Sequence, residues 1–572
     1  VNFGYKNIDF GNYDIPSGAI LHEEEDHEDH DEDEHHDEDM GFLNNSDYAV
    51  EATKFGISKV GDWGYVGFSV DNLESVYGIP FHGDEHGDEH GDEHGDEHGD
   101  EEEHDEHGEE RIFSTTDSES FTIKGSYNIN GSLINKIDFN YRDSDYSLTE
   151  DHAEEEHDEE EEHDEEEEHE EHAPTVFMNE AVEYGATFDI SNDSSTQKVV
   201  VNFVDEDNSI VGEEAFMNPA NSKEFTIGYY LSKDLGIYDL DIGFRHDQIE
   251  RSGSVSEEEH GDHHDDDHGD DHGDEHGDEH GEVDYYNIDD STNSFAVTLG
   301  RSLTDNLGVS LGYASVERLP SSIELFMNGP HMATGRFEVG DPNLNSETSN
   351  NFDITFNFDN GDFYAYASFY ITDVDNYIAL IDEEDDHMDE DEHHEDEDDH
   401  HEEEGEHHED EHDDHGHGNL IHANYMQEDA EFDGYEIEFG RSFDLGSGEL
   451  ALSFGRDVVN AEFADGHNVP RINPARNIYS LVYTQDDLLF KLMLKDVEKQ
   501  NDFGEGETAT DSYQMLNTRL TKTFNAIGNG ELKVSLFANN LLDEVARNHS
   551  SFVKDEVPLP GRNYGLKFNL TF

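Results

Sequence analysis

The sequence predicts an all-β protein, a transmembrane antiparallel β-barrel with long, acidic, His-rich extracellular loops. Three observations support this prediction: segments of alternating apolar and polar side chains, connections that alternate between short and long, and 11% aromatic residues in an otherwise acidic chain. No run of about eighteen apolar residues occurs, so an α-helical span is excluded and only a closed barrel could cross a membrane.

Period-two patterning identifies about twenty candidate strands. In one of them, Leu450, Leu452 and Phe454 alternate with small or polar residues, as expected when one face of a strand contacts lipid. The candidate strands are 1–10, 48–58, 64–73, 119–128, 134–148, 180–191, 197–205, 223–233, 236–250, 293–303, 307–317, 348–359, 362–381, 420–443, 448–458, 475–485, 487–500, 512–524, 530–541 and 561–572.

The connections between these segments alternate strictly in length. The short ones hold turn residues: Gly61-Asp62, Asn130-Gly131, Asn192-Asp193, Asp234 to Gly236, Asp305-Asn306, Asn360-Gly361, Gly446 to Gly448, Asp486-Asp487 and Gly528 to Gly530. The long ones include five His/Asp/Glu runs, which we expect to be disordered, at 22–39, 82–110, 150–172, 257–282 and 382–417. Alternate connections of an up-and-down barrel lie on opposite sides of the membrane, so the runs should share one rim. A soluble protein of several sandwiches does not require this alternation.

The C-terminal segment has the pattern of a last barrel strand. Tyr564, Leu566, Phe568, Leu570 and Phe572 alternate with polar or small residues, which predicts one face in contact with outer-membrane lipid. A terminal Phe after such a strand resembles the assembly signal of outer-membrane proteins. An ordinary edge strand is the alternative interpretation.

Composition restricts the ligand. With Asp+Glu 148 against Lys+Arg 29, the net charge of -119 argues against nucleic acid or anionic lipid as a partner and favours cations. The chain has no Cys, so a transition-metal site must use imidazole and carboxylate. No Ser/His/Asp order, nucleotide-binding glycine loop or catalytic carboxylate pair stands out, and we therefore predict that the protein is not an enzyme.

Two stretches resemble TonB-dependent receptors. The first, resembling the mid-barrel loop of the family, is ERLPSSIELF at 317–326, followed by NGPH at 328–331, FEVG at 337–340 and DPNL at 341–344. The second, similar to the last hairpin of the family, is NNLLD at 539–543, then RNH at 547–549 and PLPGR at 558–562. Together with YDIP at 13–16 and YGIP at 77–80 before His-rich loops, they look like the zinc-uptake (ZnuD-like) branch.

This resemblance implies a receptor of the bacterial outer membrane, driven by the TonB–ExbB–ExbD complex. Receptors of this family carry an N-terminal plug domain and a TonB box before a barrel of 22 strands. Counting back from the last strand places Val1 at about the third strand, so we expect the plug and the first hairpin to be missing from this chain, and residues 1–572 to form the barrel.

The five runs contain 34 of the 39 histidines, and imidazole interleaved with carboxylate is the donor set that zinc, nickel or copper(II) prefers. Carboxylate alone would favour calcium or magnesium. We therefore predict a divalent transition metal, most simply zinc, as transported ligand, with no covalent cofactor. Glycine at every fourth position argues against a helix and favours flexible, exchanging sites. The candidate ligands in the runs are His82, His86, His90, His94, His98, His268, His272, His276, His280, His393, His394, His400 and His401.

An ordered metal site should use residues on fixed backbone near the pore mouth. Candidates are Glu324, His331, His422 and His549, although a structural role suits each of them singly. Three other interpretations stay open. The runs could be repeat-expanded acidic loops without a ligand, the barrel could only buffer metal or bind a cationic partner, or it could be a haem or siderophore receptor that uses His331 or His549.

Overall fold

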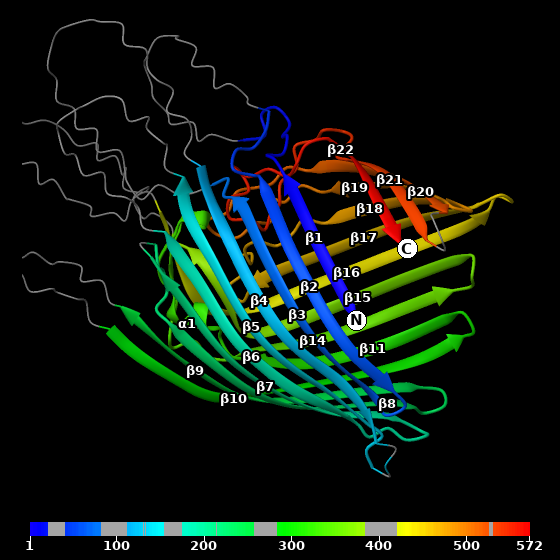
Figure 1. The fold of residues 1–572 in the computed structure, drawn as a ribbon, viewed down its shortest axis with the longest axis horizontal. Helices are drawn as coiled ribbons and strands as arrows, with labels where there is room; N and C mark the ends of the chain where they lie inside the picture. The colour runs from blue at the N-terminus through cyan, green and yellow to red at the C-terminus, as the bar shows by residue number, and fades with distance from the viewer. Residues whose placement is uncertain are drawn as a thin grey trace, which may run out of the picture.

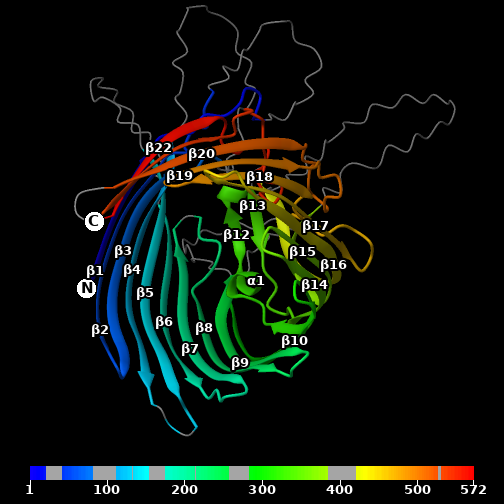
Figure 2. The ribbon, with the colours of Figure 1, turned by 90° about the vertical axis from the view of Figure 1, so that its right-hand side faces the viewer.

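The structure is a computed structural model that describes residues 1–20, 41–81, 111–129, 131, 133–153, 174–212, 214–256, 283–383, 420–525 and 530–571. In this part of the chain, 22 strands form one sheet that curves into a barrel (Figures 1 and 2). Twenty are long and pair antiparallel with their neighbours in chain order; the other two, β12 and β13, lie in one connection. No described helix is long and apolar enough to span a membrane.

The long strands are β1 (Asn2–Phe10), β2 (Tyr48–Gly61), β3 (Gly64–Gly78), β4 (Arg111–Asn128), β5 (Lys136–Ala153), β6 (Thr175–Asp189), β7 (Thr196–Val211), β8 (Ala220–Asp234), β9 (Asp239–Ser256) and β10 (Val283–Thr304). They continue with β11 (Leu307–Arg318), β14 (Glu347–Asp359), β15 (Phe363–Asp382), β16 (Ile421–Asp444), β17 (Glu449–Phe463), β18 (Arg476–Gln485), β19 (Leu488–Val497), β20 (Tyr513–Asn525), β21 (Glu531–Asn539) and β22 (Asn563–Thr571).

All twenty predicted strands are confirmed, and several extend further toward the long connections than their sequence pattern indicated. Two predicted boundaries were wrong. Residues 150–153, assigned to an acidic run, belong to β5, because ladder pairing with residues 111–114 of β4 outweighs their polar composition. Asp382, the predicted start of another run, is the buried last residue of β15.

The two faces of the sheet differ as a barrel in lipid requires. Tyr184, Phe203 and Phe225 are register partners across β6, β7 and β8, and Phe244 continues the apolar face onto β9. On the other face, the Asn202 side chain donates a hydrogen bond to Glu183, at 3.2 Å. The alternation of apolar and polar residues along these strands therefore produces an aromatic outer face and a polar interior.

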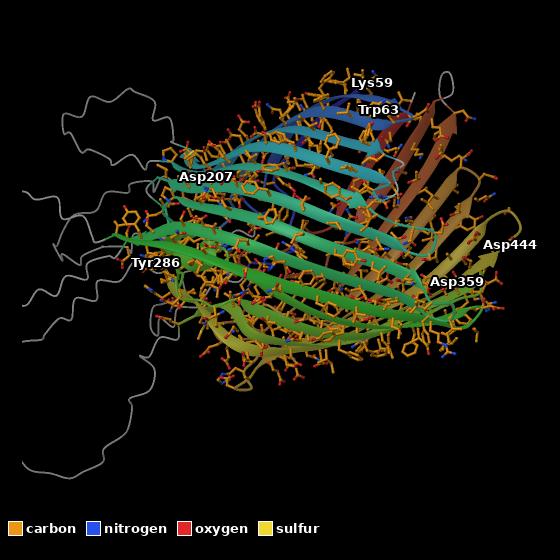
Figure 3. The ribbon with its side chains drawn as sticks, turned by 90° about the horizontal axis from the view of Figure 1, so that it is seen from below. Lys59, Trp63, Asp207, Tyr286, Asp359 and Asp444 are labelled. Carbon is orange, nitrogen blue, oxygen red and sulfur yellow. The ribbon has the colours of Figure 1, made fainter. Side chains whose placement is uncertain are left out.

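The two ends of the barrel carry different connections. Figure 3 shows Lys59, Trp63, Asp359 and Asp444 at the end with short turns, and Asp207 and Tyr286 toward the opposite end. The strands that flank all five His/acid runs meet their long connections at that opposite end. The predicted gathering of the runs at one rim follows from this topology.

β1 and β22 are the two edges of the sheet, and no ladder joins them within the described residues. At the long-loop end, the Tyr13 hydroxyl donates to the Pro558 carbonyl at 2.9 Å, and the Gly561 amide donates to the Asp14 carbonyl at 2.7 Å. A small core around Ile15 lies beside these contacts. Loop contacts therefore join the two edges at this rim.

One long connection folds back inside the barrel (Figure 2). It contains α1 (Ser322–Phe326), β12 (Asn328–His331), a 3-10 turn (Met332–Thr334) and β13 (Arg336–Val339), which pairs parallel to β16. The Phe326 ring is fully buried and fills the space where a Cβ on Gly253 would lie, at 2.5 Å. This packing against β9 positions the connection near the mouth of the barrel.

Candidate functional site

Glu324 stabilises the start of α1. Its side chain accepts a hydrogen bond from the Ser321 amide while the Ser321 hydroxyl accepts one from the Glu324 amide, which makes a capping box. Both carboxylate oxygens also accept from Arg318, at 2.9 and 3.1 Å, and Arg318 reaches Glu347 as well. Glu324 is thus already engaged in holding the inner connection to β11.

His331 is held by a carboxylate on the neighbouring short strand. Its Nδ1 lies 2.8 Å from Oε1 of Glu338, and the Thr334 hydroxyl donates to the same oxygen at 2.9 Å. Glu338 is buried, and the Phe216 ring lies 4.8 Å from the imidazole. This is the arrangement in which a carboxylate fixes one imidazole nitrogen and directs the other to a cation.

His422 lies near the start of β16, beside β13. It is the register partner of Phe337, and the two rings stack at 5.1 Å. Because side chains alternate along a strand, Phe337 and Glu338 point to opposite faces of this short ladder. His422 and His331 therefore belong to different faces, although the strands that carry them lie close together.

His549 lies in the β21/β22 connection with a fully buried side chain. Nδ1 is 2.7 Å from the Thr510 hydroxyl, whereas Nε2 lies 3.9 Å from Oε2 of Glu507 and has no hydrogen bond within the described structure. Burial lowers the pKa of His549, an effect that Glu507 opposes and Lys554 reinforces. The ring is therefore neutral at pH 7.

The four ordered candidates do not converge. Within the described ranges, no group of three or more His, Asp or Glu side chains is arranged to hold a metal ion. The thirteen candidate histidines of the runs, from His82 to His401, lie outside the described residues. Any ordered site built from the described candidates would therefore have few protein ligands, with His331 and Glu338 as the most developed pair.

A cavity of about 450 Å³ lies beside this region, lined by residues from several connections. Arg336 on β13 is buried and makes a two-pronged ion pair with Asp382, at 2.8 and 2.6 Å. The guanidinium carbons of Arg336 and Arg471 lie 4.4 and 4.2 Å from the centre of the Phe552 ring. Lys554 also lines the cavity and is only 5% exposed.

This cationic cluster was not predicted from the sequence. Cationic side chains are scarce in this sequence, and their positions could have indicated the cluster. The chain has only 29 Lys and Arg, and none of them falls in the five His/acid runs. Arg336, Arg471 and Lys554 all lie in the remaining long connections, where a cation is conspicuous against the acidic background.

A family model for the TonB dependent receptor-like β-barrel matches residues 45–541, which is most of the chain. The chain belongs to this family. It is accordingly an outer-membrane β-barrel, and the family implies TonB-coupled transport rather than catalysis. The predicted fold and location are confirmed, whereas the zinc-uptake branch stays a prediction.

Solved structures of low sequence identity share the fold of this receptor barrel. Copper transporter OprC aligns with a TM-score of 0.68 at 12% identity, over 99% of this chain and 75% of that one. The FrpB iron transporter from Neisseria meningitidis gives 0.61 at 12% identity, over 99% and 76%. A Serratia marcescens hemophore receptor HasR, in complex with its hemophore HasA and heme, gives 0.58 at 11% identity, over 98% and 74%. At these identities the likeness concerns the fold.

Proposed function

We propose that this receptor barrel binds a divalent transition metal, most simply zinc, and imports it across the outer membrane by TonB-coupled transport. The observation that carries the proposal is the placement of 34 of the 39 histidines in five connections, all attached to the long-loop end of the barrel. In barrels of this kind the long loops face the outside of the cell. The His/acid runs would therefore bind metal on the outer side of the membrane, where it reaches the cell.

The donor chemistry supports a borderline cation. Each run mixes imidazole with carboxylate and contains no Lys or Arg, so like charges would not repel the metal. His331 and Glu338 would act as an ordered acceptor inside the rim, because Nδ1 is fixed by the carboxylate and Nε2 is left to ligate. His422 lies on the other face of the ladder and Glu324 is engaged by Arg318 and Ser321, so neither is assigned to this acceptor.

Structural neighbours agree with a metal ligand in general terms. One carries the name of a copper transporter and another that of an iron transporter. The haem alternative would place His331 or His549 at a large planar ligand, yet the His549 side chain is fully buried and His331 is held by Glu338. We therefore favour an ion over haem. The growth experiment described next also tests the alternative that the barrel only buffers metal.

The deciding experiment uses a bacterial strain that depends on this receptor for zinc. Under zinc chelation, deleting the gene should lower growth and cellular zinc. A variant with the 34 run histidines replaced by Gln keeps the carboxylates and the loop lengths, and it should behave nearly like the deletion. Unchanged growth and zinc content in the deletion strain would eliminate import. A growth defect that the Gln variant fully rescues would eliminate the runs as the zinc-gathering element.

A further inference from the structure

We propose that the cavity beside Phe552 binds a small organic carboxylate, held between the ammonium of Lys554 and the guanidinium of Arg471. None of the proposed metal ligands lines this cavity, and the site takes an anion on a chain whose net charge is -119. Its volume of about 450 Å³ is within the usual range of small-ligand pockets.

Lys554 is the first of the two cations that would hold the ligand. The residue is 5% exposed and lines the cavity, yet its ammonium makes no hydrogen bond or ion pair with any described residue. An ammonium has N–H donors and no acceptor, and because Nζ of Lys554 is not among the fully buried atoms without a partner, its donors are open to the cavity. Burial lowers the pKa of Lys554, and Arg336 and Arg471 lower it further, while Glu507 and Asp555 oppose them. A bound carboxylate would supply the missing acceptor.

Of the three carboxylates that line the cavity, Glu507 and Asp555 are engaged elsewhere, and the third is Glu556. Glu507 accepts from the amides of Arg471 and Gly504, at 2.8 and 2.9 Å. Asp555 accepts from the Thr508 hydroxyl at 2.8 Å and lies 3.9 Å from Arg547. These bonds hold the two carboxylates in the walls of the cavity. Neither carboxylate therefore takes the position of a ligand between Lys554 and Arg471.

Arg471 supplies the second cation and is held in an uncommon conformation. Its backbone has φ of 64°, in the left-handed region that non-glycine residues rarely adopt. The side chain stacks on Phe552 and donates to the Leu380 carbonyl, which leaves other N–H groups of the guanidinium for a ligand. Strain of this kind persists where the surroundings fix a functional geometry.

Phe552 explains how two guanidinium groups stay close together. They lie over the same ring at 4.4 and 4.2 Å, and cation–π attraction offsets part of their repulsion. Arg336 is neutralised by Asp382, so Arg471 and Lys554 are the cations available to the ligand. Two cations on separate connections suit a di- or tricarboxylate better than a single acetate.

The test is calorimetric titration of the purified full chain in detergent with citrate, without metal. We expect binding that Lys554→Gln and Arg471→Gln each weaken by about tenfold or more, as for the loss of a charge-assisted hydrogen bond. Lys554→Arg should retain binding. Lys499→Gln is the matched control, because that ammonium pairs with Asp511 on the exposed surface at 3.1 Å and does not line the cavity. Heat-dependent gel mobility checks that each variant is folded.

Two results would overturn the proposal: no heat of citrate binding to the intact protein, or equal affinity in Lys554→Gln and Lys499→Gln when both are folded. There is a third such result, because the same carboxylate chemistry is present in run 82–110. Citrate binding that appears only after deletion of this run would assign the site to the run and exclude a free ligand. Zinc binding by the runs is measured without citrate, so failure here and failure of the proposed function are distinguishable.

Discussion

The long connections at the long-loop rim form two groups that differ in composition. The five His/acid runs contain 34 histidines and no Lys or Arg. The second group contains few histidines but holds Arg336, Arg471 and Lys554. The structure describes its four connections, which are 319–346, 464–475, 498–512 and 540–562. Apolar and cationic side chains supply the packing and ion pairs that fix a loop, whereas His and carboxylate supply donors to metal. The His/acid group therefore has the composition to gather a cation, and the second group has the composition to build a fixed site.

The largest effect should follow from shortening the His/acid group. Runs 82–110 and 382–417 hold half of the run histidines, so deleting both should remove about half of the bound zinc. The second deletion must begin at 384, because Asp382 pairs with Arg336. Zinc stoichiometry by equilibrium dialysis, at pH 7.5 and 5.5, measures this. Zinc should be released at the lower pH, since imidazole must be neutral to ligate and its pKa is near 6.5. Equal stoichiometry in both proteins would contradict the division between the two groups.

The next effect concerns the ordered group. Asp382→Ala leaves Arg336 buried without its partner, which should destabilise the inner connection by about 3–5 kcal/mol. Hydrogen exchange of residues 319–346 should accelerate accordingly. Lys499→Ala breaks an exposed pair and should leave this exchange unchanged. Slow exchange retained in Asp382→Ala would mean that the connection is held by packing alone.

A smaller effect should appear with pH in the same group. Burial lowers the pKa of His549, so the unfolded connection binds more protons than the folded one just below pH 6.5. The stabilisation of the connection by neutral His549 is therefore fully present above the pKa of the unfolded state. It is lost as the pH falls toward the lower pKa of His549 in the folded state. Exchange of residues 540–562 should speed up between pH 7.5 and 5.5, after correction for the intrinsic rate. His549→Gln should reduce this dependence, and an unaltered dependence would assign it to other groups.

The smallest effect is local to α1. Ser321→Ala removes the N-cap hydrogen bond and should cost about 1 kcal/mol, visible as faster exchange in residues 322–327 alone. Zinc stoichiometry should not change, because this residue stabilises the ordered group without taking part in gathering. A fall in zinc binding would show that α1 positions a metal ligand, which would make Glu324 more than a structural residue.

The sequence predicted the strands better than the site. Period-two alternation and turn residues are local signals, so they identified all twenty long strands. Glu324 and His331 were expected on fixed backbone, but the fold of the inner connection was not predicted, because Phe326 is fixed by a contact with Gly253 on another strand. The cationic cavity joins Arg336, Arg471 and Lys554 across distant connections, and no spacing in the sequence records that proximity. Likewise, Glu338 was found beside His331 only through the pairing of β12 and β13.

The loop contacts between the sheet edges bear on the order of folding. The hydrogen bond from Tyr13 to Pro558 spans 545 positions, so its formation closes a loop of nearly the whole chain. Each barrel hairpin closes a much shorter loop and has less entropy to lose. The rim contacts should therefore form last, once both edge strands are already in register. Gly561 leaves little room for a side chain there, since an added Cβ would lie 3.0 Å from the Asp14 carbonyl oxygen. The contacts between residues 13–15 and 558–561 should therefore be the last to protect their amides from exchange during refolding.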